Sequence, residues 1–172
     1  MPIIQKSFVL LENTPDYCFA HWSSVFLVIW RSGGETTLEA VGKLRREFER
    51  FAAAHPSGVT LLTIVETGAA LPPSHVRDAL AGFMRSCDGK LKLSAVAFEG
   101  TGFRAAAVRG VVTSLTLLAR QPFPHKVFST VEEAARWYEA ELGKTTITPF
   151  DRNALISSLG DLRQEIADQV VA

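Results

Sequence analysis

Three apolar runs decide how this chain folds: Val25-Phe-Leu-Val-Ile-Trp-Arg31, Val59-Thr-Leu-Leu-Thr-Ile-Val-Glu66 and Leu93-Ser-Ala-Val-Ala-Phe-Glu99. Each run ends on a charged residue and is followed by a helix signature. Runs that are apolar at nearly every position are typical of strands covered on both faces, as in parallel sheets. If these strands are parallel, their charged ends lie at the carboxyl edge of the sheet, where open α/β sheets usually bind ligands.

The segments between the runs carry the start and stop signals of helices. Thr36 and Glu39 predict a capping box at the start of an amphipathic helix, which His55-Pro-Ser-Gly58 ends. Pro73 suits the first position of a second helix, which Asp88-Gly89 closes. The first helix is expected to turn five apolar residues toward the core: Leu38, Val41, Leu44, Phe48 and Phe51.

Further elements are predicted at both ends of the chain. Residues 7–12 and 17–22 indicate strands that form a small meander with the first apolar run. A third helix is expected from Gly102, a short strand over 126–129, and two more helices after it. Thr130 with Glu133 predicts a second capping box, and Asp151 caps the last helix.

The last helix has four apolar residues at 4-3-4 spacing: Leu155, Leu159, Leu162 and Ile166. Such a seam can dock on the domain or pair with a second copy of the chain in a homodimer. Packing of the helix on its own domain is favoured, because two heptads alone make a weak coiled coil.

Together the elements predict an α/β fold with a mixed, largely parallel sheet of about five to six strands and packed helices. We expect the α/β domain to span residues 1–148 and a C-terminal helical extension to span 149–172.

Composition excludes several classes of function. Lysine plus arginine balance aspartate plus glutamate, 18 against 18, so the chain offers no electrostatic case for binding nucleic acid or an anionic membrane. No stretch is long and apolar enough to span a membrane, and the N-terminus lacks the order of a signal peptide. The two cysteines, Cys18 and Cys87, are expected to be reduced, buried thiols in a cytoplasmic protein.

The charged strand ends are the first candidate site. Glu66 and Glu99 form a carboxylate pair if their strands are adjacent, and such a pair can divide acid and base roles or hold a metal. Arg31 would neutralise one of them or grip an anionic ligand. The alternative interpretation is that a charge at a strand exit only marks where the backbone reaches water.

Other chemistry has little support in the sequence. The histidines are scattered without the spacing of metal ligands, so neither a metal nor a cofactor is predicted. There is no Gly-x-Ser-x-Gly elbow, and the glycine turns lack the spacing of phosphate or dinucleotide loops. Ser74 lies in the first turn of the second helix, where a phosphate would gain from the helix dipole. The alternative for Ser74 is an ordinary helix-start serine.

The layout from about Phe8 to Leu142 resembles the STAS or SpoIIAA-like fold of the anti-sigma-factor antagonists. Residues 58–66, 102–109 and 127–135 carry the likeness. The resemblance implies a non-catalytic regulatory or protein-interaction module. In antagonists of this family a phosphorylated serine within an Asp-Ser-Ser/Thr-Gly motif begins the second helix. Ser74 falls near that place, in Pro72-Pro-Ser-His-Val76, although the motif itself is absent.

Two hypotheses on function follow. The first is the interaction module, with a protein partner bound around Ser74 and the loop 67–73. The second is a small-ligand or lipid-binding protein, or an enzyme, that works at the carboxyl edge. It predicts a cavity lined by Arg31, Glu66, Glu99 or Arg104.

Overall fold

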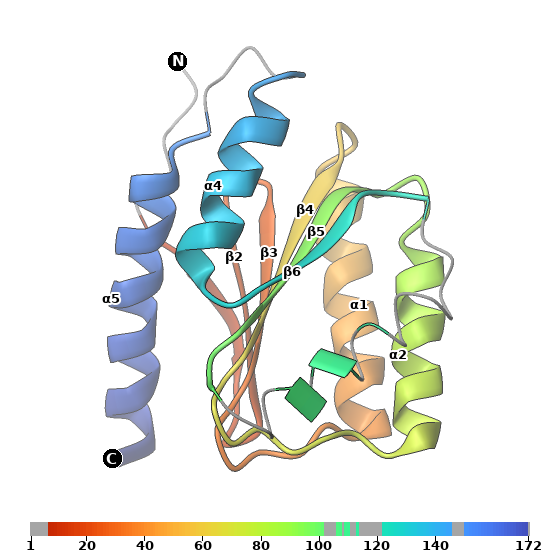
Figure 1. The fold of residues 1–172 in the computed structure, drawn as a ribbon, viewed down its shortest axis with the longest axis vertical. Coiled ribbons are helices and arrows are strands. Elements are labelled where there is room, and N and C mark those ends of the chain that lie inside the picture. The colour runs from red at the N-terminus through yellow and green to blue at the C-terminus, as the bar shows by residue number, and fades with distance from the viewer. Residues whose placement is uncertain are drawn as a thin grey trace.

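The three apolar runs form adjacent parallel strands within a six-stranded sheet (Figure 1). This computed structural model describes residues 7–101, 106–107, 109–110, 113, 122–145 and 150–171. The strands are β1 (Val9–Asn13), β2 (Tyr17–Trp22), β3 (Val25–Trp30), β4 (Val59–Val65), β5 (Leu91–Phe98) and β6 (His125–Phe128). The helices with described bounds are α1 (Leu38–Ala54), α2 (Ser74–Ser86), α4 (Val131–Leu142) and α5 (Arg152–Val171).

The strands lie in the sheet in the order in which they occur in the chain. β1, β2 and β3 pair antiparallel, and β3 through β6 pair parallel, which confirms the predicted mixed, largely parallel sheet. Crossovers between parallel strands are right-handed, so an order that advances in one direction keeps successive crossover helices on one face. The opposite face therefore needs a different cover.

Two apolar clusters, one on each face, hold the layers together. On one face α1 and α2 pack on the sheet, where the Phe48 ring lies 5.6 Å from Phe26 and 5.4 Å from Phe83. On the other face α4 and α5 pack on the alternate residues of the strands (Figure 1). Every residue of β3 is buried. Cover on both faces is the physical reason that the run is apolar throughout.

α4 and α5 are tied firmly into the second face. The hydroxyl of the fully buried Tyr138 donates a 2.5 Å hydrogen bond to the carbonyl of Leu61 in β4, and burial raises the pKa of that hydroxyl. The apolar seam of α5 is buried against the sheet in the same cluster, as expected for packing on its own domain. Its residues are Leu155, Leu159, Leu162 and Ile166. A division after residue 148 and a homodimer through α5 remain predictions.

Helix starts differ from the predicted positions by one residue. Thr37, not Thr36, caps α1: its backbone is extended and its Oγ1 accepts a 3.1 Å hydrogen bond from the Ala40 amide. Thr36 is buried, so its side chain is not at the open end of the helix. Pro73 is the cap of α2, and its first helical residue is Ser74. At α4 the N-cap is Thr130 as predicted: its hydroxyl oxygen accepts from the Glu133 amide, and the Glu133 carboxylate accepts from the amide of Ser129 rather than of Thr130.

The remaining predictions concern the third helix and membrane-spanning segments. The third helix, expected from Gly102, falls mostly outside the described residues. Across the described ranges, none of the helices combines the length and apolar character needed to cross a bilayer.

Candidate functional site

Glu66 and Glu99 meet at the carboxyl edge of the sheet. Each directly follows its strand, and the last paired residues of β4 and β5, Val65 and Phe98, are opposite one another. The Glu99 amide continues the ladder with a 3.0 Å hydrogen bond to the carbonyl of Val65. The strands are adjacent, which is the condition under which the two carboxylates were expected to come together.

Arg163, on α5, lies between these carboxylates. Its two terminal nitrogens donate hydrogen bonds of 2.5 and 2.6 Å to the two carboxylate oxygens of Glu99. One of them also lies 3.5 Å from an oxygen of Glu66. A bidentate arginine–carboxylate contact fixes both groups in orientation as well as in distance.

The contacts of the carboxylates indicate what this cluster does. Arg163 takes both oxygens of Glu99 and one oxygen of Glu66, and the backbone amide of Ser32 donates to the other Glu66 oxygen at 2.9 Å. A general base or a metal ligand needs an oxygen that faces a reactant or an ion. This cluster instead joins β4, β5, α5 and the loop after β3, so its chemistry is that of a structural clamp.

The charge of Arg163 is secured by its partners. Burial acts to lower the pKa of Arg163, but the hydrogen bond to Glu99 and the charges of Glu99 and Glu66 outweigh it and raise that pKa. The adjoining loops are equally constrained. The Thr67 hydroxyl donates to the Glu99 carbonyl at 2.6 Å, and a Cβ at Gly68, where φ is +87°, would lie 3.0 Å from the Ser32 hydroxyl.

Arg31 does not join this cluster. Its guanidinium donates to the side-chain oxygen of Asn13 at 2.8 Å and to the Thr14 carbonyl at 3.1 Å, so it supports the turn between β1 and β2. Arg104 lies outside the described residues. Of the three described residues predicted for this edge, the structure therefore brings together Glu66 and Glu99, and it adds Arg163. A sequence signal for Arg163 existed, because it directly follows Leu162 of the apolar seam.

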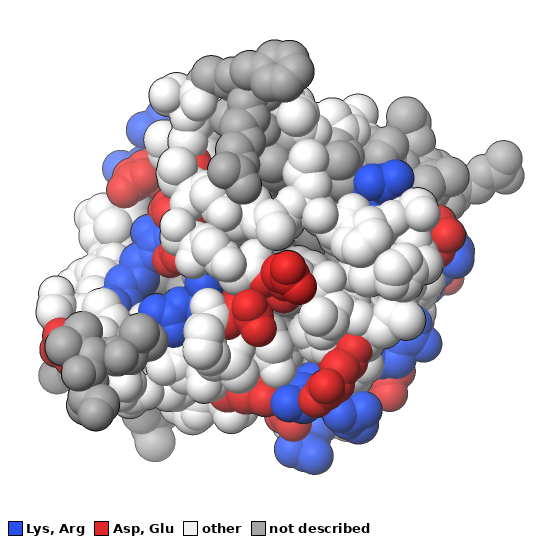
Figure 2. All heavy atoms as spheres, turned by 90° about the horizontal axis from the view of Figure 1, so that it is seen from below, with Lys and Arg blue, Asp and Glu red and all other residues white. Residues whose placement is uncertain are grey.

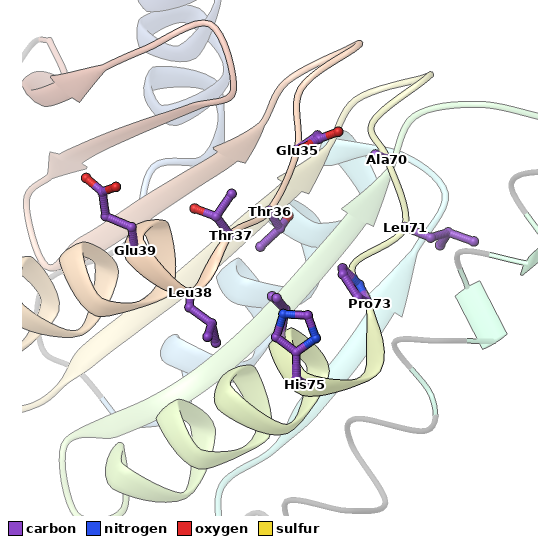
Figure 3. A pocket seen from close by; sticks show the side chains of 10 residues that line it. Glu35, Thr36, Thr37, Leu38, Glu39, Ala70, Leu71, Pro73 and His75 are labelled. Carbon is purple, nitrogen blue, oxygen red and sulfur yellow. The ribbon is translucent and has the colours of Figure 1, made fainter.

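A separate cleft opens at the same edge between the starts of α1 and α2 (Figure 3). Residues 35–39 line one side, residues between Ala70 and Val76 line the other, and the enclosed volume is about 450 Å³. Leu38 and His75 point into the same space, while Leu71 points outward from the rim (Figure 3). None of Arg31, Glu66 and Glu99 lines this cleft.

Leu38 lines the cleft and is not part of the core, contrary to the sequence-based prediction. It was expected to face the core, but 53% of its surface is exposed, and Leu71 on the opposite rim is 43% exposed. Leu38 keeps the helical spacing of the buried residues, yet it is the first residue of α1 and lines the cleft. Spacing alone reports the face of a helix and not how far the neighbouring layer extends along it.

Backbone hydrogen bonds hold the two loops of the cleft together. The Gly33 amide donates to the Gly68 carbonyl and the Ala70 amide donates to the Gly34 carbonyl, both at 3.1 Å. At Gly34 a Cβ would meet the backbone of Asp16 at 2.6 Å, so only glycine permits this approach. The cleft is thus preformed between fixed loops.

Ser74 lies at the start of α2 beside the cleft and is exposed. The cap residue Pro73 makes no side-chain hydrogen bond to the helix end, and the first turn holds no acidic residue. The end of α2 therefore has unneutralised backbone donors, which is an environment that favours negative charge.

The acidic character of this edge is visible on the surface. Figure 2 views the end of the molecule where the parallel strands finish, and acidic side chains gather near its middle with basic side chains beside them and toward the margin.

Within the described part of the chain, no three or more histidine, cysteine, aspartate or glutamate side chains are grouped to hold a metal. Cys18 and Cys87 are both buried, and burial raises the pKa of each thiol to about 12.

Comparisons with known proteins add no relative. A scan against protein-family models finds no match for this chain, and searches of the curated proteins and of the solved structures find none either.

Proposed function

We propose that this chain is a non-catalytic regulatory or protein-interaction module, similar in role to the anti-sigma-factor antagonists that its layout resembles. The partner surface is the cleft between the starts of α1 and α2, with Ser74 at its margin. The observation that carries the proposal is the exposure of Leu38 and Leu71 on opposite sides of a preformed cleft.

Exposed leucines at the margins of a hollow are a typical feature of a binding surface. Large apolar side chains are often exposed singly, but their grouping at a concave place marks sites of contact with a partner. The clamp at Glu66, Glu99 and Arg163 supports the same proposal, because it commits the paired carboxylates to holding the fold.

The proposal is tested by site-specific cross-linking in the cells that express the protein. A photoreactive amino acid at Leu38 is expected to yield a discrete cross-linked protein, and the adduct is expected to disappear when Leu71→Ser is added. The same probe at Asp161, exposed on α5, serves as the control. Equal adducts from both positions, or none from Leu38, would contradict the proposal.

Phosphorylation at Ser74 would make the module a switch. A phosphate there would gain from the free backbone donors of α2 and would add charge at the margin of the cleft. The complex identified by cross-linking is expected to respond differently to Ser74→Glu and Ser74→Ala. A complex that is equally stable with both substitutions excludes the phosphoswitch and leaves the interaction module standing.

A second candidate is a small-ligand or lipid-binding protein that uses the same cleft. Its volume of about 450 Å³ favours this, since pockets for small molecules span roughly 300–1,000 Å³. Thermal-shift screening with anionic and amphipathic metabolites tests it. A stabilising ligand that Leu38→Ser abolishes would favour the second candidate over the first.

A further inference from the structure

The two sides of the cleft differ in charge as well as in shape. On the α1 side Glu35 is exposed, and its backbone amide donates a 2.9 Å hydrogen bond to the carboxylate of Asp16, which holds the two residues together. Glu39, in the first turn of α1, has a side chain that is 79% exposed. Two carboxylates, Glu35 and Glu39, thus line the side of the cleft on which Leu38 lies, and Asp16 is held beside Glu35.

The neighbouring cations leave part of this charge uncompensated. Lys43 lies 3.0 Å from Glu12 and 3.4 Å from Glu39, and Arg31 is bound to Asn13 and Thr14. Among the ion pairs formed by the described residues, none includes Asp16 or Glu35. Glu35, which lines the cleft together with the exposed Leu38, therefore forms no ion pair within the described part of the chain.

We infer that the cleft binds a protein segment that presents an apolar side chain next to a lysine or arginine. The apolar side chain would lie in the cleft against Leu38, where it removes that leucine from water, and the segment would cross the rim at Leu71. The basic side chain would reach Glu35 and its neighbour Asp16, neither of which forms an ion pair with another described residue. This inference rests on the proposed interaction module and names the chemistry of its partner.

A protein segment fits the cleft better than a free cation or a free fatty chain. A free cation would leave Leu38 in water, and a fatty acid would leave Glu35 without a counter-charge. Only a ligand with both characters satisfies both halves of the surface. Opposite charges across an interface set specificity and the rate of association more than total affinity.

The test is a selection from a displayed library of random twelve-residue peptides on the full chain, with the Leu38→Ser/Leu71→Ser variant as counter-target. We expect peptides that depend on the two leucines and share an apolar residue within two positions of lysine or arginine. Leucine-dependent peptides that are neutral or acidic would overturn the inference and leave the proposed function standing. Peptides that bind both targets equally, or no enriched peptides, would count against both.

The strongest selected peptide is then titrated against charge variants by calorimetry. Glu35→Gln is expected to weaken binding about fivefold, and Glu35→Gln with Asp16→Asn about tenfold or more, at low salt. Glu132→Gln, exposed on α4 on the opposite face, is the matched control and is expected to leave the affinity unchanged. Heat denaturation of each variant checks that it is folded. Equal affinities for Glu35→Gln and Glu132→Gln would overturn the inference.

Discussion

Two parts of the same sheet edge differ in whether other elements cover them. On the α5 side Glu66 and Glu99 are held by Arg163, and the apolar seam of α5 is buried beside them. On the side of α1 and α2, Leu38 and Leu71 remain exposed around an open cleft. The difference teaches that a charge at a strand end is not itself a sign of chemistry. What matters is whether another element supplies its counter-charge.

The largest difference between the two sides is expected when a leucine is shortened on each. Leu155→Ala should lower the free energy of unfolding by about 3 kcal/mol, because Leu155 is fully buried and its truncation leaves a cavity. Leu38→Ala should change it by less than about 0.5 kcal/mol, because Leu38 is 53% exposed. Urea denaturation measures both. Similar costs would show that the cleft leucine is part of the core.

Acid provides a second test, which probes His125 of β6. The Nδ1 of His125 lies 2.9 Å from the buried Ser94 hydroxyl, and burial lowers the pKa of His125 to about 4. Below the usual histidine pKa of about 6.5, His125 binds a proton in the unfolded chain but not in the folded chain. Stability therefore falls as the pH drops from about 6.5 toward 4. The loss should reach about 2.5 kcal/mol at pH 4.5.

His21 acts in the same direction, since burial lowers its pKa as well. The effect of His125 is isolated by comparing urea midpoints of the wild type and His125→Phe at pH 7.5 and 4.5. The variant is expected to be less stable at pH 7.5 and to lose less on acidification. An undiminished loss in His125→Phe would shift the acid response to other groups, the clamp included.

The clamp is tested by removing its cation. Arg163→Met should cost about 2 kcal/mol, because two half-buried carboxylates are left facing each other without a counter-charge. Adding Glu66→Gln and Glu99→Gln should restore much of that loss. Arg152 is on the same helix as Arg163 and forms an exposed ion pair with Glu139 of α4. Arg152→Met should therefore cost less than about 0.5 kcal/mol. Equal costs for the two arginines would reduce the clamp to an ordinary surface pair.

The smallest expected effect lies at the open side. Ser74→Glu should stabilise the fold by roughly 0.5 kcal/mol, because the first turn of α2 holds no acidic residue and has no side-chain cap. Ser74→Gln controls for the change in size, and a rise of the urea midpoint with glutamate alone identifies the charge. Raising the salt concentration should diminish the gain.

Much of the architecture could be predicted because its signals are local. β3 is apolar throughout since both of its faces are covered, and the cap at Thr130 involves residues three positions apart. The cap of α1 is Thr37 and not Thr36: the capping-box spacing to Glu39 fits Thr36 alone, but Thr36 is buried and the Thr37 side chain accepts from the Ala40 amide. The seam of α5 was recognised, and its docking agreed with the preferred interpretation.

The sites were predictable only in part. Adjacency of β4 and β5 brings Glu66 and Glu99 together. The sequence places Arg163, 64 residues beyond Glu99, directly after the apolar seam, but it does not indicate which carboxylates Arg163 binds. Leu38 was assigned to the core for its helical period, and only the tertiary structure shows that it lines the cleft. The cleft itself joins two loops that are separate in the chain.

The sequence by itself determined the secondary structure, the parallel centre of the sheet and the position of its carboxyl edge, because apolar periodicity and capping act over a few residues. Only the tertiary structure decided which charges at that edge are neutralised and which apolar side chains remain open. Those outcomes depend on contacts between elements far apart in the chain, such as Arg163 with Glu99 and the loop of Leu71 beside the start of α1. Local sequence patterns carry no information about such distances.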